Sequence, residues 1–223
     1  MNVALLALVL SGAPELNTEG FRLYQQGKYG EALARFRDAI AADERHALAQ
    51  YNFAATLGLL RKRGKTCEFD AYQSTIVEHL AKAVALDERR RARMQRDADF
   101  DSVRDSLGYQ RLLKRDPAND ADVKALLIAL AFLSPPQGAY GHTVQLDLKA
   151  DGTLTCSQVL VDEDVKRVTT SGTWKVKGRA VTVSFKKKVA GVTSAVGTFN
   201  AAGHLVFETP AWDLSSDRSD CDA

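Results

Sequence analysis

The sequence offers few residues at spacings that support catalysis. The stretch 63–66 (RGKT) ends like a phosphate-binding loop, but Gly58 and Gly64 are separated by five residues instead of four, and no strand pattern precedes them. The four histidines are far apart without HExxH spacing, and no GxSxG turn occurs. We therefore predict a protein that is not an enzyme and carries no cofactor. A hydrolase with a dispersed active site is the weakest alternative.

A second stretch, Asp97–Asp101 (DADFD), places three carboxylates at alternate positions, as a calcium-binding loop does. The sixth position of such a loop is glycine and the twelfth is glutamate, whereas this chain has Ser102 and Gly108 there. Without the tight turn and the bidentate ligand, we predict no calcium site and no other metal site. Helix capping by Asp99 or Asp101 is the preferred interpretation.

The composition is that of an ordinary folded protein without a strong charge bias. Of 223 residues, 45% are hydrophobic and 26% are charged, and the net charge is +2. This balance argues against a nucleic-acid partner. Five arginines between positions 89 and 96 would spread around a helix. They form either a solubilising face or a surface for an acidic partner.

The N-terminal residues 1–13 have the pattern of a signal peptide. Val3–Leu10 is an apolar run followed by small residues, although no basic residue precedes it and Pro14 follows directly. The alternative is the first turns of a buried helix. The pattern favours export from a bacterial cell, to the periplasm or envelope, over a cytoplasmic location. No run reaches the roughly 20 apolar residues that a membrane span requires.

The three cysteines, Cys67, Cys156 and Cys221, lack the CxxC spacing of zinc or redox sites. Cys156 and Cys221 both lie in the second half of the chain. If the protein is exported, they are candidates for a disulfide. The alternative is two unlinked thiols, one buried in a strand and one on a tail.

Gly20–Asp43 has the pattern of two helices joined by a turn. Small and apolar residues recur at three and four positions, which is one face of a helix. Glu31–Asp43 aligns with Thr75–Asp87 at a constant offset of 44, and the preceding helices align at an offset of 34. The sequence therefore predicts two helical hairpins, with ten extra residues, Arg61–Asp70, inserted in the second.

The first hairpin resembles the tetratricopeptide repeat (TPR). The matching positions are Gly20, Gly27, Tyr29, Ala32, Phe36 and Ala39, and the resemblance extends over about Glu15–Asp87. It implies a peptide-binding groove formed by the first helix of each hairpin. The predicted groove residues are Asn17, Phe21, Tyr24, Tyr51 and Asn52.

Asn52 stands where the family often has an asparagine that holds the peptide. Asn17 and Phe21 stand where the family's carboxylate clamp has lysines. The resemblance therefore argues against capture of a free C-terminus in the manner of that clamp. Packing of the two hairpins explains the same residues equally well.

From about residue 140 the pattern changes to alternating apolar and polar residues separated by turns. About six short antiparallel strands are expected, in a meander or small barrel. The stretch 171–185 (SGTWKVKGRAVTVSF) resembles the GxW-type strand of lipocalin-like domains. We interpret Trp174 as a core residue.

The predicted fold class is α+β, with TPR-like hairpins followed by an antiparallel β-meander or small barrel. The expected domains are a helical domain at 14–118, a linker helix with a proline-rich boundary at 119–136, and a β domain at 137–223. The predicted function is a scaffold that binds a peptide or protein segment of unknown identity. The alternative is a carrier that holds a small apolar ligand in a lipocalin-like β domain.

Overall fold

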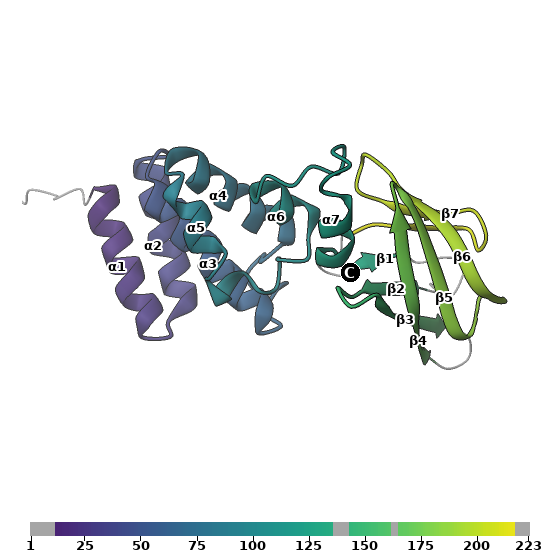
Figure 1. The fold of residues 1–223 in the computed structure, drawn as a ribbon. Coiled ribbons are helices and arrows are strands. Elements are labelled where there is room, and N and C mark those ends of the chain that lie inside the picture. The colour runs from purple at the N-terminus through teal and green to yellow at the C-terminus, as the bar shows by residue number, and fades with distance from the viewer. Residues whose placement is uncertain (1–11, 136–142, 162–164, 217–223) are drawn as a thin grey trace, which may run out of the picture. The chain divides into compact units, whose positions relative to one another are not determined.

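The computed structural model describes residues 12–135, 143–161 and 165–216. The fold class is α+β, as predicted: helices come first and an antiparallel sheet follows (Figure 1). The chain divides into two compact units, and the boundary in the sequence lies between Val103 and Arg104. Among the described residues, no helix is long and apolar enough to cross a membrane.

The first unit consists of two helical hairpins followed by two short helices. Its elements are α1 (Ala13–Gln25), α2 (Tyr29–Ala42), α3 (Ala47–Lys62), α4 (Gln73–Leu86), α5 (Arg89–Met94) and the 3-10 helix η1 (Ala98–Phe100). Within each hairpin the two helices pack against each other. In the first hairpin, Gly20 makes this approach possible, because a Cβ there would lie 2.6 Å from the Phe36 ring.

The repeat pattern read from the sequence matches the burial of the second helices. Three pairs of residues at equivalent positions are fully buried: Ala32 and Ile76, Phe36 and Leu80, Ala39 and Ala83. The expected insertion lies between α3 and α4, where it leaves these packed faces unchanged. The hairpins are therefore TPR-like.

The second unit begins earlier in the sequence than expected. It includes α6 (Leu107–Leu112) and α7 (Val123–Ala129), which the sequence pattern places in the helical domain and in a linker. Leu126 and Leu127 of α7 are buried in the same core as the strands. An apolar helix face of this size must be covered, and here the sheet covers it. The expected boundaries at 118 and 136 therefore differ from the observed one.

Eight strands form one antiparallel sheet in which each strand pairs with the next in the sequence. The strands are β1 (Phe132–Leu133), β2 (Thr143–Leu148), β3 (Thr153–Val161), β4 (Val165–Lys177), β5 (Ala180–Val189), β6 (Val192–Phe199), β7 (Leu205–Phe207) and β8 (Trp212–Leu214). Leu133 exchanges two backbone hydrogen bonds with Ser215, at 2.8 and 2.9 Å. This bridge connects the two ends of the sheet, which makes the sheet barrel-like.

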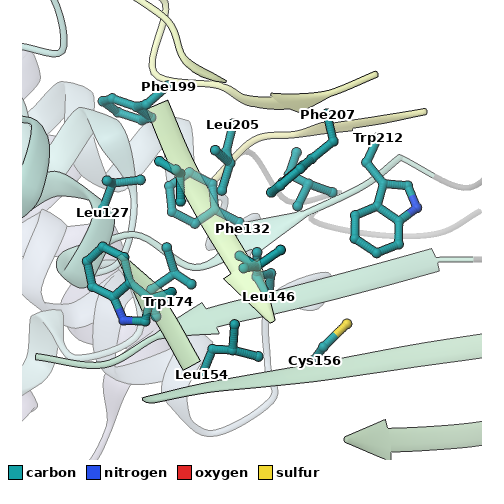
Figure 2. Close-up of a cluster of buried hydrophobic side chains, with 14 of the residues drawn as sticks. Leu127, Phe132, Leu146, Leu154, Cys156, Trp174, Phe199, Leu205, Phe207 and Trp212 are labelled. Carbon is teal, nitrogen blue, oxygen red and sulfur yellow. The ribbon is translucent and has the colours of Figure 1, made fainter. Parts of the chain in front are cut away.

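Aromatic and aliphatic side chains occupy the interior of this sheet (Figure 2). The rings of Phe132 and Phe199 meet edge to face with centroids 6.1 Å apart, and those of Phe207 and Trp212 do so at 5.7 Å. Trp174 belongs to this core, as predicted, and its Nε1 donates a 2.8 Å hydrogen bond to the carbonyl oxygen of Lys149.

Cys156 is a free thiol in this core, which fits the alternative of an unlinked thiol buried in a strand and not the possible disulfide with Cys221. Alternation along β3 puts the Cys156 and Leu154 side chains on the same, buried face of the sheet. Burial raises the pKa of the Cys156 thiol to about 11, which makes it unreactive. Cys221 itself lies outside the described residues.

Two valines on adjacent strands test how far the sheet interior determines stability. Val183 on β5 is fully buried, whereas Val196 on β6 is 61% exposed. We expect Val183→Ala to lower the free energy of unfolding by about 2 kcal/mol, because it removes two buried methyl groups and leaves a cavity. Val196→Ala should change it by less than about 0.5 kcal/mol. Urea unfolding of both variants measures the difference, and equal losses would contradict this assignment of the core.

Candidate functional site

A pocket of about 250 Å³ opens on the first unit. Two of its walls come from the first helix of each hairpin, with Phe21 and Tyr24 from α1 and Tyr51 and Asn52 from α3. The third wall comes from the segment after α4. It contributes Arg93, Asp97 and Asp99.

The structure brings together four of the five residues that the sequence analysis proposed for a groove. Phe21 is 41% exposed although it is large and apolar. Its ring stacks beside that of Tyr24, with centroids 6.1 Å apart and planes within 7°. Tyr51 and Asn52 follow on the neighbouring helix. Their placement fits the offset of 34 between the first helices of the two hairpins.

Asn17, the fifth residue proposed for the groove, does not line the pocket. It is buried, and its Oδ1 accepts a 2.9 Å hydrogen bond from Nδ2 of Asn52. This buried bond joins α1 to α3. The hydrogen bond gives both buried amide side chains a partner and connects the two hairpins. The Asn52 Nδ2 group therefore already donates a hydrogen bond within the protein.

The acidic wall of the pocket is held by two tyrosine hydroxyl groups. The Tyr24 hydroxyl donates to Oδ2 of Asp99 at 2.6 Å, and the Tyr51 hydroxyl donates to Oδ2 of Asp97 at 2.8 Å. Hydrogen bonds to a carboxylate are stronger than those between neutral groups. Burial and the adjacent carboxylates raise the pKa of both tyrosines far above the ordinary value, so both stay protonated even at strongly alkaline pH.

Asp97 also organises the turn that carries Asp99. Its Oδ1 accepts a hydrogen bond from the backbone N–H of Asp99 at 3.2 Å, which makes Asp97 the N-cap of η1. Helix capping within the DADFD stretch was the preferred interpretation of the sequence, but Asp97 performs it instead of Asp99 or Asp101. The pairing of Asp97 and Asp99 with tyrosines 46 and 75 residues away in the chain has no local signal in the sequence.

The turn docks directly on the backbone of α3 because position 58 is glycine. A Cβ on Gly58 would overlap the carbonyl oxygen of Asp99. Ser102 Oγ donates to the carbonyl oxygen of Gly58 at 3.0 Å. The buried Phe100 ring meets Tyr51 edge to face, with centroids 5.4 Å apart. These contacts fix the position of both carboxylates relative to α3.

Several arginines of the segment 89–96 have partners within the first unit. Arg89 pairs with Asp87 at 2.8 Å, and Arg91 pairs with Glu88 at 2.7 Å. Arg93 lies over the Tyr51 ring with its guanidinium carbon 5.1 Å from the centroid. A cation near a ring face is attracted by the ring electrons, so Arg93 forms part of the pocket wall.

Comparisons with known proteins add little to this geometry. No family model matches the chain, and no curated protein matches it. A solved structure described as "First TPR of Spaghetti (RPAP3) bound to HSP90 peptide SRMEEVD" is 22% identical, covers 51% of this chain and 86% of that chain, and has a TM-score of 0.30. Similarity at this level does not indicate what the present chain binds. Among the described residues, no group of three or more acidic, histidine or cysteine side chains is placed to hold a metal ion.

The Tyr51–Asp97 hydrogen bond has a matched control elsewhere in the same unit. Tyr72 also donates its hydroxyl to an aspartate, Asp70, at 2.8 Å, but in an exposed setting. We expect Tyr51→Phe to lower the free energy of unfolding by about 1–2 kcal/mol, because Asp97 loses a donor in a half-buried site. Tyr72→Phe should cost less than about 0.5 kcal/mol. Thermal denaturation of the two variants compares these losses, and an equal effect would show that the Tyr51 bond does not hold the turn.

Proposed function

We propose that this protein is a non-enzymatic scaffold that docks a peptide or protein segment in the pocket between α1 and α3. The observation that carries the proposal is the exposed Phe21 ring, which lines a pocket together with Tyr24 and Tyr51. Aromatic side chains that remain accessible in a concave surface are typical anchors of protein interfaces. The resemblance of the hairpins to tetratricopeptide repeats supports the same surface.

The chemistry of the pocket supports a binding role over a catalytic one. The hydroxyl groups of Tyr24 and Tyr51 donate hydrogen bonds to carboxylates, and the pKa of each hydroxyl is raised. A tyrosine in that state is a poor acid and a poor nucleophile at neutral pH. With a volume of about 250 Å³, the pocket suits one or two side chains of a partner. We expect modest affinity because the contact area is small.

The alternative function, a small-ligand carrier, receives less support from the structure. It requires space inside the β domain, as the lipocalin-like resemblance of the Trp174 strand implies. The side chains of Phe132, Phe199, Phe207 and Trp212 point into that interior and are buried against one another. An apolar ligand would have to displace packed aromatic rings, at a cost of several kcal/mol for each.

We also propose that the protein is exported from a bacterial cell. The apolar N-terminal run supports this location, and so does a disulfide at Cys67. Disulfides persist in oxidising compartments such as the periplasm and are rare in the cytosol. Cys156, in contrast, is a free thiol.

Mass spectrometry of the natively expressed protein tests the export proposal. We expect a mature chain that lacks its first residues, because a signal peptide is removed on export. Non-reducing peptide mapping should find Cys67 in a disulfide and Cys156 as a free thiol, with Cys221 as the expected partner of Cys67. An intact Met1 together with three free thiols would refute export.

Selection of peptides from a random display library with the full-length protein tests the docking proposal. We expect enriched peptides whose affinity, measured by fluorescence anisotropy, falls about tenfold on Phe21→Ala because an interface anchor is lost. Leu86→Ala is the matched control, because Leu86 is 39% exposed on α4 and does not line the pocket. Failure to enrich any peptide that depends on Phe21 would refute the proposed function.

A further inference from the structure

We propose that the outer face of β4, β5 and β6 binds the surface of a membrane that contains anionic lipids. This inference concerns the second unit and goes beyond the docking pocket of the first. Three observations carry it: the sign of the charges on these strands, a bulge that exposes consecutive lysines, and exposed valines on the strands beside that bulge. A face whose lysines only keep the protein soluble is the competing interpretation.

The three strands carry positive charges only. They are neighbours in the sheet (Figure 1), and residues 165–199 include eight lysines and arginines but no aspartate or glutamate. Arg179 is neutralised, because it pairs with Asp120 at 2.7 Å. The basic residues 166–167 are left out because three acidic residues precede them directly in the sequence. Five lysines remain, at positions 175, 177, 186, 187 and 188.

These five lysines are accessible to a ligand. On β4, the Trp174 side chain lies in the core, so the alternation of the strand directs Lys175 and Lys177 to the outer face. All five lysines are exposed, and none of them forms an ion pair with another described residue. A negatively charged surface can therefore approach them without displacing a carboxylate of the described chain.

A bulge in β5 exposes three of the lysines in a row. The pairing of β5 with β6 is interrupted between Ser184 and Val189, where residues 185–188 lie opposite Thr193 alone. In a regular strand, alternate side chains would point toward the core. Here all three lysines of the bulge are exposed. Bulges redirect side chains in this way and are frequent next to functional sites.

Exposed valines accompany the lysines. In the second unit, the large apolar side chains exposed among the described residues are Val165 and Val168 on β4 and Val196 on β6. Val196 is 61% exposed and lies in one row with Lys175, through Thr182 on the strand between them. Membrane-surface proteins combine cations for lipid phosphates with apolar side chains that enter the headgroup region. Binding of single-stranded nucleic acid relies on exposed aromatic rings, and these exposed side chains include none.

Vesicle binding of the full-length protein tests the proposal. The probes are large unilamellar vesicles of phosphatidylcholine alone and of an equal mixture of phosphatidylcholine and phosphatidylglycerol. Bound protein is measured by co-sedimentation. We expect binding to the mixed vesicles at low salt and no measurable binding to phosphatidylcholine alone. Binding to the mixed vesicles should fall as salt is raised, because exposed charges are screened.

The triple variant K186Q/K187Q/K188Q should weaken binding to the mixed vesicles about a hundredfold, since each lysine near an anionic surface contributes about a factor of five. Arginine at the same three positions should preserve binding. The matched control replaces Lys62, Lys65 and Lys82 of the first unit by glutamine. It removes the same charge from lysines that already pair with carboxylates. An equal loss in this control would show that net charge alone governs binding and would overturn the proposal.

A tryptophan reporter identifies the face that meets the membrane. The natural Trp174 and Trp212 are buried, so an added exposed indole gives a distinct signal. In Val196→Trp, the emission should move to shorter wavelength when mixed vesicles are added, because the indole enters the headgroup region. Leu86→Trp is the control, since Leu86 is 39% exposed on α4 of the first unit and should give no change. An unchanged Val196→Trp spectrum with bound vesicles would exclude this face.

Other outcomes would also overturn the inference. Equal binding to both kinds of vesicle, or binding to neither, contradicts recognition of anionic lipid. Tighter binding to a short DNA duplex than to mixed vesicles, at equal phosphate concentration, would identify the face as a nucleic-acid surface. The docking function is tested separately: Phe21→Ala should leave vesicle binding unchanged, and the failure of either proposal leaves the other standing.

Discussion

The hydrogen bonds from Tyr24 and Tyr51 to the carboxylates of the turn 97–101 are the interactions on which the candidate site depends. They join the first helix of each hairpin to a segment that follows both hairpins in the sequence. Two parallel helices alone would leave a shallow, mostly apolar surface. The turn adds a polar wall, and the absence of a side chain at Gly58 lets it sit against α3. The pocket is therefore a product of three segments, each positioned by a different contact.

The β domain satisfies a different constraint, since its core must be covered on every side. The paired hydrogen bonds between Leu133 and Ser215 connect the ends of the sheet, and α7 contributes Leu126 and Leu127 to the same core. Large rings then occupy the interior. The stability of such a domain comes from the packing of its buried side chains. Its interior therefore fits a structural role better than a carrier role.

The sequence predicted those parts of the molecule that follow from local periodicity. The buried faces of the hairpins and the position of Trp174 in a core required only spacing and residue type. Phe21, Tyr24, Tyr51 and Asn52 could be placed on one surface because the repeat relates the two helices that carry them.

Other features depended on contacts between distant segments, which periodicity does not encode. Asp97 and Asp99 were visible as a pattern of carboxylates, yet their partners lie on helices far away in the chain. The apolar face of α7 showed that the helix must be covered, but not that the strands would cover it. Likewise, residue type alone made Cys156 a candidate for a disulfide. The alternation of side chains along β3 instead directs the Cys156 side chain toward the core.

The charge of Asp99 is the feature that packing explains least. An asparagine at this position would avoid the cost of holding an ion in a half-buried site, but it would accept a weaker hydrogen bond from Tyr24 than the carboxylate does. That cost is visible in the raised pKa of Asp99, since burial disfavours its ionised form in the folded protein. The hydrogen bond from Tyr24 and the nearby cations Lys62 and Arg63 favour the ionised form and offset part of that cost.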